Sequence, residues 1–256
     1  MTQPIRWARA LRSLSWLIDR PIAHRGLHDA ANGIIENTSS AFEAAIRHGY
    51  AIECDLQLSG DGEAMVFHDA TLDRLTEQRG KLLDRTAAEL QSVRFKATAD
   101  RMPTLAELIE QVDGRATLLI ELKSHWDGSL ALARRAAEVT EGYHGPFALM
   151  SFDPELVAAI RELAPQAVRG IVAERMTDPT ETRLDVARRI ELRYLKHIAK
   201  SWPYFLSYDV QGLPSGLTRA FRAAGLPVIC WTVRDPETAK RARRYCDQIT
   251  FEGFLP

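Results

Sequence analysis

Residues 51–76, AIECDLQLSGDGEAMVFHDATLDRLT, place two acids inside an apolar run typical of a buried strand. In a β-strand, residues i and i+2 share a face, so Glu53 and Asp55 point to one side and residues 52, 54 and 56 to the other. Two adjacent carboxylates repel each other, and a divalent cation with oxygen ligands removes that cost. The alternative is a pair of solvated acids on a half-exposed strand.

Short apolar runs of β type alternate with helical patterns after residue 20. The runs are PIAHRG, AIECDLQL, AMVFHD, TLLIELK, FALMSF, VRGIVAE, FLSYDV, PVICWTV and QITFEG. Such alternation predicts a parallel α/β sheet. The number of runs is close to eight once a hairpin partner is allowed, and 256 residues suit a closed (β/α)₈ TIM barrel. A doubly wound open sheet is the alternative, although no GxGxxG or GxxxxGK[ST] motif follows any strand.

Helix start signals support this organisation. Thr38 or Ser40 is expected to cap the first helix, with Glu43 as a capping-box partner. Later helices are predicted to start at Pro103-Thr104, Asp153-Pro154 and Asp235-Pro236. The alternation stops between residues 69 and 102, where a polar segment predicts a small insertion on an early βα loop. We therefore expect one barrel domain over residues 21–256.

Composition excludes several classes of protein. The 33 basic and 34 acidic residues nearly cancel, so no long-range field attracts nucleic acid, and any anion site must be local. Three scattered cysteines predict neither a disulfide framework nor a zinc cluster, which favours a reducing compartment. No apolar run approaches the roughly 18 residues of a membrane span. These features predict a soluble, cytoplasmic protein.

The first 18 residues, MTQPIRWARALRSLSWLI, form a basic amphipathic pattern. Trp7, Leu11, Leu14 and Ile18 fall on one helical stripe, surrounded by arginines and no acid. The segment lacks the apolar core and cleavage site of a secretory signal. We expect an N-terminal helix over residues 1–20 that caps the domain, with weak contact to a membrane surface through residues 1–18 as the alternative.

Further polar residues stand at strand ends, where barrel active sites gather. The run LLIELKS places Glu121 and Lys123 on one face of another apolar strand. His24 and His68 each follow a short apolar run. A lone histidine there is more often a packed or capping residue, but two histidines beside three carboxylates favour general acid/base catalysis near neutral pH.

With these motifs in its order, the sequence resembles the glycerophosphodiester phosphodiesterase family. The resemblance rests on IAHRG, ENTSSAF, IECDLQLSGDG, VFHDATLDRLT, MPTLAEL, IELK, SFD and WTVRDPE, which occur in the family's order from residue 21 onward. It implies a TIM barrel with a small insertion and metal-dependent cleavage of a phosphodiester, usually to an alcohol and glycerol 3-phosphate.

The resemblance also implies roles for individual residues. Glu53, Asp55 and Glu121 match the metal ligands, for Mg²⁺ or Ca²⁺, and hard oxygen donors suit those ions. His24 and His68 match the general acid/base pair. Arg25 and Lys123 match the family's residues that hold the phosphate, and Trp231 matches a family tryptophan that lines the mouth of the pocket. Glu36 and Asn37 match the ENT motif, with Glu36 expected near the metal either in direct contact or as a supporting acid.

Some questions stay open at the level of sequence. The substrate's own hydroxyl or water activated at the metal could attack phosphorus. The chain has ITFEGFLP where the family often ends its last strand with an acid and proline, and HDA for the commoner HDP, so we expect this chain to differ from the family at the pocket rim and in its preferred leaving alcohol. A lysophospholipase D or related phospholipase-type phosphodiesterase is the alternative activity, and a non-catalytic binding barrel is a weaker one. The oligomeric state is not predicted.

Overall fold

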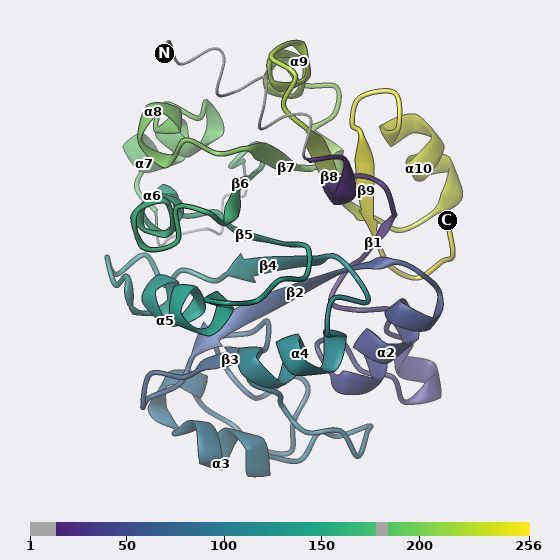
Figure 1. Ribbon diagram of the computed structural model, residues 1–256, viewed down its shortest axis with the longest axis vertical. Coiled ribbons are helices and arrows are strands. Elements are labelled where there is room, and N and C mark those ends of the chain that lie inside the picture. Colours follow the sequence, from purple (N-terminus) through teal and green to yellow (C-terminus); the bar gives the residue numbers. More distant parts are fainter. Residues whose placement is uncertain (1–13, 178–183) are drawn as a thin grey trace.

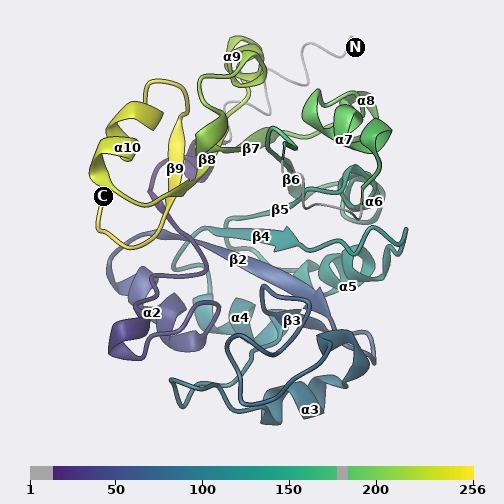
Figure 2. The ribbon, with the colours of Figure 1, turned by 180° about the vertical axis from the view of Figure 1, so that it is seen from behind.

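The computed structural model describes residues 14–177 and 184–256, and its centre is a closed barrel of parallel strands (Figures 1 and 2). The strands are β1 (Ile22–Ala23), β2 (Ala51–Leu58), β4 (Leu118–Leu122), β5 (Phe147–Ser151), β6 (Val168–Ala173), β7 (Phe205–Asp209), β8 (Val228–Val233) and β9 (Gln248–Phe251). The barrel closes because β1 pairs in parallel with both β2 and β9. The predicted (β/α)₈ barrel is confirmed, and the open sheet is wrong. The hairpin partner is β3 (Ala64–Val66), antiparallel to β2.

Helices surround the barrel (Figure 1). They are α2 (Ser39–Arg47), α4 (Leu105–Val112), α5 (Ala131–Thr140), α6 (Pro154–Leu163), α7 (Val186–Arg193), α8 (Ile198–Ser201), α9 (Gly216–Ala223) and α10 (Pro236–Ala242), with the short turns η2 (Ala30–Asn32) and η4 (Val210–Gly212) between elements. Thr104, Asp153 and Asp235 cap α4, α6 and α10 through their side chains, as predicted.

The predicted side-chain cap of α2 is wrong, although the predicted N-cap residue is correct. Thr38 occupies the N-cap position, but no side chain caps the helix. The hydroxyl of Thr38 donates to the carbonyl of Ile35 at 2.7 Å, and that of Ser40 donates to Asp100 at 3.1 Å. Both hydroxyls are engaged by neighbouring loops, which compete with the helix terminus for the same groups.

Strand alternation separates the inside of the barrel from the outside. Along β2, Ala51 packs in the interior cluster with Leu119 and Phe205, whereas Ile52 and Cys54 pack in the larger cluster that lies under the helices. Glu53 and Asp55 follow Ala51 at intervals of two, so they face the interior at the carboxyl end of the strand. The alternation of side chains along β2 therefore directs both Glu53 and Asp55 into the barrel.

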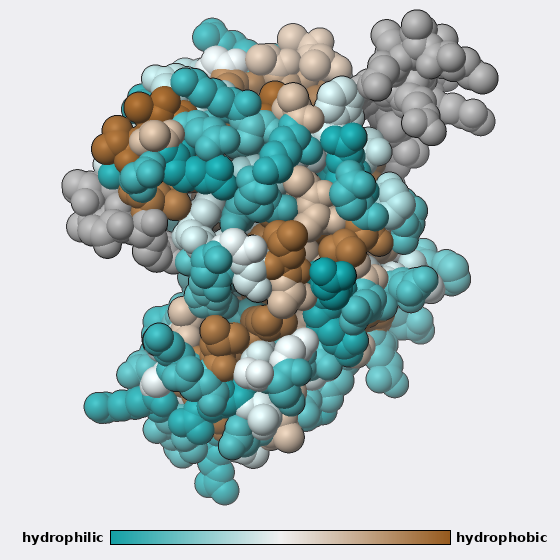
Figure 3. Space-filling model, turned by 90° about the vertical axis from the view of Figure 1, so that its left-hand side faces the viewer, coloured by the Kyte–Doolittle hydropathy of each residue, from teal (hydrophilic) through white to brown (hydrophobic). Residues whose placement is uncertain are grey.

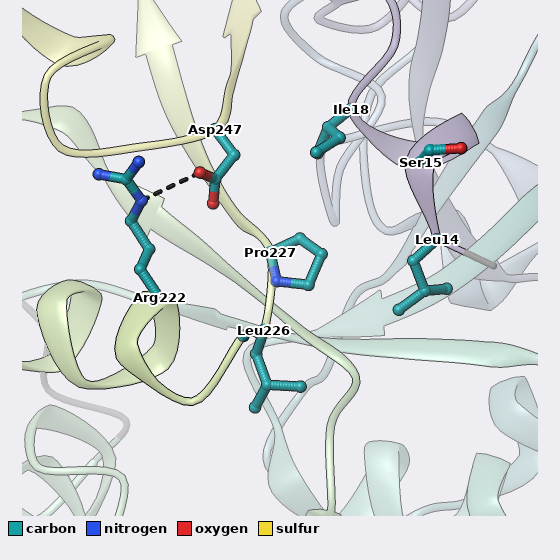
Figure 4. A pocket seen from close by; sticks show the side chains of 8 residues that line it. Leu14, Ser15, Ile18, Arg222, Leu226, Pro227 and Asp247 are labelled. Atoms are coloured by element: carbon teal, nitrogen blue, oxygen red, sulfur yellow. Dashed lines mark hydrogen bonds and ion pairs between the residues drawn. The ribbon is translucent and has the colours of Figure 1, made fainter. Parts of the chain in front are cut away.

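The other end of the barrel is covered by residues that precede β1. The turn η1 (Ser15–Leu17) buries Leu17 against Ile22 and Phe205. Figure 4 shows a nearby cavity of about 410 Å³, where Leu14 and Ile18 face Leu226 and Pro227. Most of the predicted N-terminal helix falls on residues 1–13, outside the described residues, so its helical form stays a prediction.

The insertion after β3 has a small core of its own. It contains η3 (Leu82–Asp84) and α3 (Ala87–Ser92), and it lies at the bottom of Figure 1. Phe67, Leu82, Leu90 and Phe95 belong to a separate buried cluster beside the barrel. The insertion is therefore packed well enough to hold a side chain in a fixed place. Of the helices in residues 14–177 and 184–256, none has the length and apolarity that a membrane crossing requires.

Candidate active site

Three carboxylates meet inside the mouth of the barrel. Parallel pairing of β2 and β4 sets Asp55 opposite Glu121, and Glu53 lies two residues earlier on the same face as Asp55. One oxygen from each of Glu53, Asp55 and Glu121 lies within 4.8 Å of the others. The three residues are 2%, 1% and 7% exposed. Ca²⁺ binds oxygen ligands at 2.3–2.6 Å, so such a spacing suits ligands of one divalent cation.

Two cationic side chains contact the same acids. Nζ of Lys123 lies 2.8 Å from Oδ1 of Asp55 and 2.7 Å from Oε1 of Glu121. Nε of Arg25 lies 3.3 Å from Oδ2 of Asp55, and the backbone N–H of Arg25 donates to Glu53 at 2.9 Å. Each of these cations is positioned to meet an anion that enters beside the acids.

The pKa values in the cluster indicate that Arg25 and Lys123 do not fully compensate the charge of the three carboxylates. Burial and the negative charges of Asp55 and Glu121 raise the pKa of Glu53 well above its ordinary value. Burial would also raise the pKa of Asp55, but the nearby Lys123, His68 and Arg25 outweigh it and hold that pKa far below the usual range. Burial opposes a charged Lys123, yet its two carboxylate neighbours raise its pKa. A bound cation would relieve the penalty concentrated on Glu53, so the donor set fits a divalent metal.

His24 follows β1 and lies beside the acids. Its Nε2 is 3.9 Å from Oε2 of Glu53, and its Nδ1 is 2.5 Å from Oε2 of Glu252, which follows β9. Glu252 is in turn held by Nε of Arg234 at 2.7 Å. Burial lowers the pKa of His24, and the hydrogen bond that its Nδ1–H donates to Glu252 opposes that effect. The contact leaves Nε2 as the ring nitrogen directed toward the carboxylates.

Glu252 itself remains ionised in this position. Burial alone would raise the pKa of Glu252, but its hydrogen bond with His24, the nearby ring of His28 at 3.8 Å and the charge of Arg234 hold that pKa well below its ordinary value. An ionised carboxylate accepts hydrogen bonds and donates none. Nδ1 of His24 must therefore carry a proton, and the proton exchanged in a reaction is that on Nε2.

His68 follows β3 and has a similar arrangement. Its Nδ1 lies 2.7 Å from Oδ1 of Asp69. Arg74, from the insertion, donates to Asp69 through Nε at 2.6 Å and to both oxygens of Glu36 at 2.7 and 2.8 Å. Hydrogen bonds with His68 and Arg74 outweigh burial and lower the pKa of Asp69. Each candidate acid/base histidine thus has a carboxylate on Nδ1 and an arginine behind that carboxylate.

Glu36 lies between two arginines. It accepts a hydrogen bond from Nη1 of Arg25 at 2.7 Å in addition to those from Arg74. It is absent from the group of three acids that could share an ion. Its contacts connect Arg25, beside the metal ligands, with Arg74, behind His68. The geometry therefore favours the supporting position for Glu36 over direct contact with a metal.

The loop after β1 is held by two tight contacts. A Cβ on Gly26, whose φ is +80°, would lie 2.8 Å from Cβ of Ala41 on α2, so only glycine fits. The amide of Asn37 donates to Oδ2 of Asp55 at 2.9 Å, and its carbonyl oxygen accepts from the Asp55 backbone at 3.3 Å. This double contact fixes Asp55 in its place.

Sequence reasoning missed several of these supporting residues. The sequence identifies Asn37 only as part of the ENT motif, and no local pattern connects it with Asp55, 18 positions further along the chain. Glu252 lies within the terminal run that departs from the family pattern. Asp69 directly follows His68 in the HDA run, but Arg74 lies in a polar segment with no periodic pattern, so only the folded insertion reveals that it reaches Asp69 and Glu36.

Trp231 lies near the carboxyl end of β8, on the inward face. Its ring packs edge-to-face against Phe152 with centroids 5.5 Å apart. Its buried indole Nε1 has no hydrogen-bond partner among the described residues. An indole N–H donates only and normally finds a partner when buried. The predicted mouth tryptophan is therefore located in the barrel with a donor available.

A separate cavity lies on the outer side of the His24 loop. It has a volume of about 830 Å³ and its lining includes Leu27, His28, Ile34, Ala44, Arg47, His48, Arg234, Glu252, Phe254 and Leu255. Glu252 belongs both to this cavity and to the contact with His24. The cavity is therefore adjacent to the candidate site and mostly apolar.

Comparisons with solved structures agree with the barrel. A phosphodiesterase from Oleispira antarctica, whose structure holds the product sn-glycerol-3-phosphate, superposes with a TM-score of 0.77 at 22% identity and covers 92% of this chain and 93% of that one. The glycerophosphodiester phosphodiesterase of Thermotoga maritima superposes with a TM-score of 0.68 at 27% identity, over 90% and 92% of the two chains. The first likeness shows the fold alone.

Sequence comparisons point the same way. Glycerophosphodiester phosphodiesterase 1 of Mus musculus is 31% identical over 66% of this chain and 54% of its own length, so the chain spans about half of that relative. YhdW of Bacillus subtilis (strain 168) is 26% identical over 86% of this chain and 88% of its own length. The model of the glycerophosphoryl diester phosphodiesterase family matches residues 24–247. This match includes the three clustered acids and both histidines, and the chain belongs to the glycerophosphoryl diester phosphodiesterase family of hydrolytic enzymes.

Proposed function

We propose that the protein hydrolyses glycerophosphodiesters to an alcohol and glycerol 3-phosphate, with a divalent cation held by Glu53, Asp55 and Glu121. The observation that carries the proposal is the buried carboxylate group, with His24 3.9 Å from Glu53 and with His68 close enough for its charge to lower the pKa of Asp55. The family match and the product bound to the Oleispira antarctica relative support the substrate class. A non-catalytic barrel is disfavoured because each histidine retains its own carboxylate partner.

The acids and cations divide the work of binding. Mg²⁺ or Ca²⁺ at the three carboxylates would polarise a phosphoryl oxygen. Arg25 and Lys123, which contact Asp55 from two sides, would bind the remaining phosphoryl oxygens. Positive groups fixed in advance offset the charge that grows on those oxygens in the transition state. Trp231 and Phe152 would contact the alcohol part of the substrate.

The two histidines would move the protons. Nε2 of one histidine takes a proton from the attacking hydroxyl, and Nε2 of the other protonates the leaving alkoxide. Glu252 and Asp69 keep the Nδ1 protons in place during both transfers. Positioned groups of this kind contribute roughly 10² to 10⁴-fold apiece.

The attacking hydroxyl can come from the substrate or from water. Attack by the neighbouring hydroxyl of the glycerol forms a cyclic phosphate that is hydrolysed in a second step. Single-turnover reactions followed by ³¹P NMR separate the routes, because the cyclic ester forms before glycerol 3-phosphate in one route and never in the other.

A lipid phosphodiester is the second candidate substrate. The apolar cavity of about 830 Å³ beside Glu252 gives a place for an acyl chain, which glycerophosphocholine does not need. Lysophospholipase D activity, with release of the head-group alcohol, would use the same acids and histidines.

A substrate panel tests both candidates. Purified protein is assayed with glycerophosphocholine, glycerophosphoethanolamine, lysophosphatidylcholine and lysophosphatidylinositol, each with Mg²⁺ and with Ca²⁺. Highest kcat/KM for a glycerophosphodiester supports the first proposal. Highest kcat/KM for a lysophospholipid assigns the lipid substrate instead. Hydrolysis of none of them, by folded protein with either cation, would refute both.

A further inference from the structure

The helices after β6 carry apolar side chains that are partly or largely exposed in the described structure. Val186 and Ile190 on α7 are 72% and 41% exposed, and Tyr194 and Ile198 after it are 55% and 39% exposed. They recur at intervals of four residues, so Val186 and Ile190 share a helix face. Figure 3 shows hydrophobic surface at the upper left, over α7 and α8, within a hydrophilic surround. We call these four residues the α7–α8 patch.

The patch has a basic surround. Between residues 184 and 200 the chain has more arginines and lysines than acids. Arg193 and Lys196 are exposed, and neither forms an ion pair with the described residues. Arg193 instead lies over the ring of Tyr194, 5.4 Å from its centroid. Apolar residues beside unneutralised cations are the pattern of a helix that lies in a lipid interface.

The position of α7 places the Val186 end of the patch at the catalytic end of the barrel, whereas Ile198 lies on α8, which leads toward the start of β7. Arg188 of α7 contacts Asp153 at 3.3 Å, and Asp153 follows β5. The same guanidinium lies 5.7 Å from the ring centroid of Trp126, which follows β4. Arg189 donates to the carbonyl of Met176, after β6, at 2.9 Å. The amino end of α7 is therefore anchored at the rim onto which the candidate active site opens.

We propose that the α7–α8 patch binds the surface of an anionic lipid bilayer and brings the barrel mouth next to it. Charge decides between this and other occupants. Residues 1–18 of this chain and the patch of a second copy are both basic, so each would be repelled. An anionic bilayer supplies both the apolar layer for Val186 and Ile190 and the negative charge for Arg193 and Lys196. The proposal concerns binding and does not depend on the substrate hydrolysed.

Vesicle sedimentation of the full chain tests the proposal. The probes are vesicles of phosphatidylcholine alone and of phosphatidylcholine mixed with phosphatidylserine. We expect binding to the mixed vesicles that weakens as salt rises, because exposed charges are screened. The double variant Val186→Glu/Ile190→Glu and the double variant Arg193→Glu/Lys196→Glu should each lose roughly tenfold or more in partition coefficient.

Matched controls separate the patch from general surface effects. Leu83 is 40% exposed in the insertion, and Lys240 is exposed on α10. Leu83→Glu and Lys240→Glu should bind like the unaltered protein. Circular dichroism and the thermal unfolding temperature verify that all variants are folded.

Three outcomes would overturn the proposal. The first is a full chain that does not associate with the mixed vesicles at all. The second is binding by both patch variants as tight as that of the unaltered protein, which would assign lipid contact to another surface such as residues 1–18. The third is a dimer, seen by sedimentation velocity without vesicles and abolished in the patch variants, which would make the patch a contact between copies.

Discussion

Nδ1 of His24 and Oε2 of Glu252 lie 2.5 Å apart, although 228 positions separate the two residues in the chain. The loop after the first barrel strand and the loop after the last are neighbours because β1 pairs with β9. Glu252 therefore acts on His24 only in the closed barrel. Arg234, after β8, fixes the second oxygen of Glu252. The orientation of one ring thus depends on three consecutive strands around the barrel.

Glu252→Ala should lower kcat for glycerophosphocholine by about 10 to 100-fold, because His24 loses the group that holds its Nδ1 proton but keeps its ring. KM should change by less than kcat, since Glu252 does not contact the phosphate-binding cations. Glu252→Gln, which retains a hydrogen-bond acceptor, should recover part of the loss. ¹⁵N NMR of the imidazole should show the Nδ1–H tautomer in the unaltered protein and a tautomer mixture in Glu252→Ala.

Glu237→Gln provides the control for charge loss in the same part of the chain. Glu237 is exposed on α10, away from the histidines. Its variant should match the unaltered protein in kcat. Equal kcat for Glu252→Ala and the unaltered enzyme would contradict a positioning role for Glu252.

Arg74→Met should lower kcat because it removes the clamp that connects Asp69 with Glu36. Asp69 would then be held only by His68 and Glu36 only by Arg25, so the partners of His68 and Arg25 would be less firmly positioned. We expect a loss of about 10-fold or more, given the 10² to 10⁴-fold contribution of a positioned acid/base group. Steady-state kinetics on glycerophosphocholine measure it.

Arg94→Met is the matched control, because Arg94 is an exposed arginine of the same insertion. It tests whether loss of any arginine from the insertion disturbs the site. Equal loss of activity in both variants would contradict a positioning role for Arg74 and would indicate that the insertion as a whole supports the barrel.

The sequence predicts those features of the fold and the site that depend on residues close together in the chain, and not those that depend on contacts between distant segments. The strand period placed Glu53 and Asp55 on one face because alternation is a property of the strand itself. The barrel followed from the repeated alternation of strands and helices. The partnership of His24 with Glu252 arises from barrel closure, and Arg74 reaches Asp69 and Glu36 only through the fold of an aperiodic insertion. The sequence contained those residues but no pattern that pairs them.

His24→Ala and His68→Ala should each lower kcat by roughly 10² to 10⁴-fold, because each removes one proton-transfer group. Neither side chain fills the apolar core, so both variants should unfold near the temperature of the unaltered protein. His144→Ala is the control, since His144 is exposed on the turn before β5. Activity of either site variant within a few-fold of the unaltered enzyme would remove that histidine from the mechanism.

EDTA should abolish activity, and added Mg²⁺ or Ca²⁺ should restore it. Because the ion binds the folded state, it should also raise the unfolding free energy, by about 2.7 kcal/mol when its concentration is 100 times Kd. Thermal unfolding with and without the cation measures this effect separately from turnover. Asp55→Asn should weaken both responses. Full activity in EDTA would refute the metal assignment.

The protonation of Glu53 gives a pH dependence that only the metal-free protein should show. Burial and the charges of Asp55 and Glu121 raise the pKa of Glu53 in the folded state above its ordinary value of 4.5. The folded state therefore binds this proton more tightly than the unfolded state does. The stabilisation from Glu53 is fully present below pH 4.5 and is lost as pH rises through the folded pKa.

Glu53→Gln imitates the protonated form at every pH, so it isolates this contribution. In EDTA, the variant should unfold at a higher temperature than the unaltered protein at pH 8, and the difference should shrink toward pH 4. With the cation present, the order at pH 8 should reverse, because a neutral amide is a weaker ligand than an ionised carboxylate. Glu237→Gln, in an exposed position, should show neither effect. A variant less stable than the unaltered protein in EDTA at pH 8 would contradict the raised pKa of Glu53.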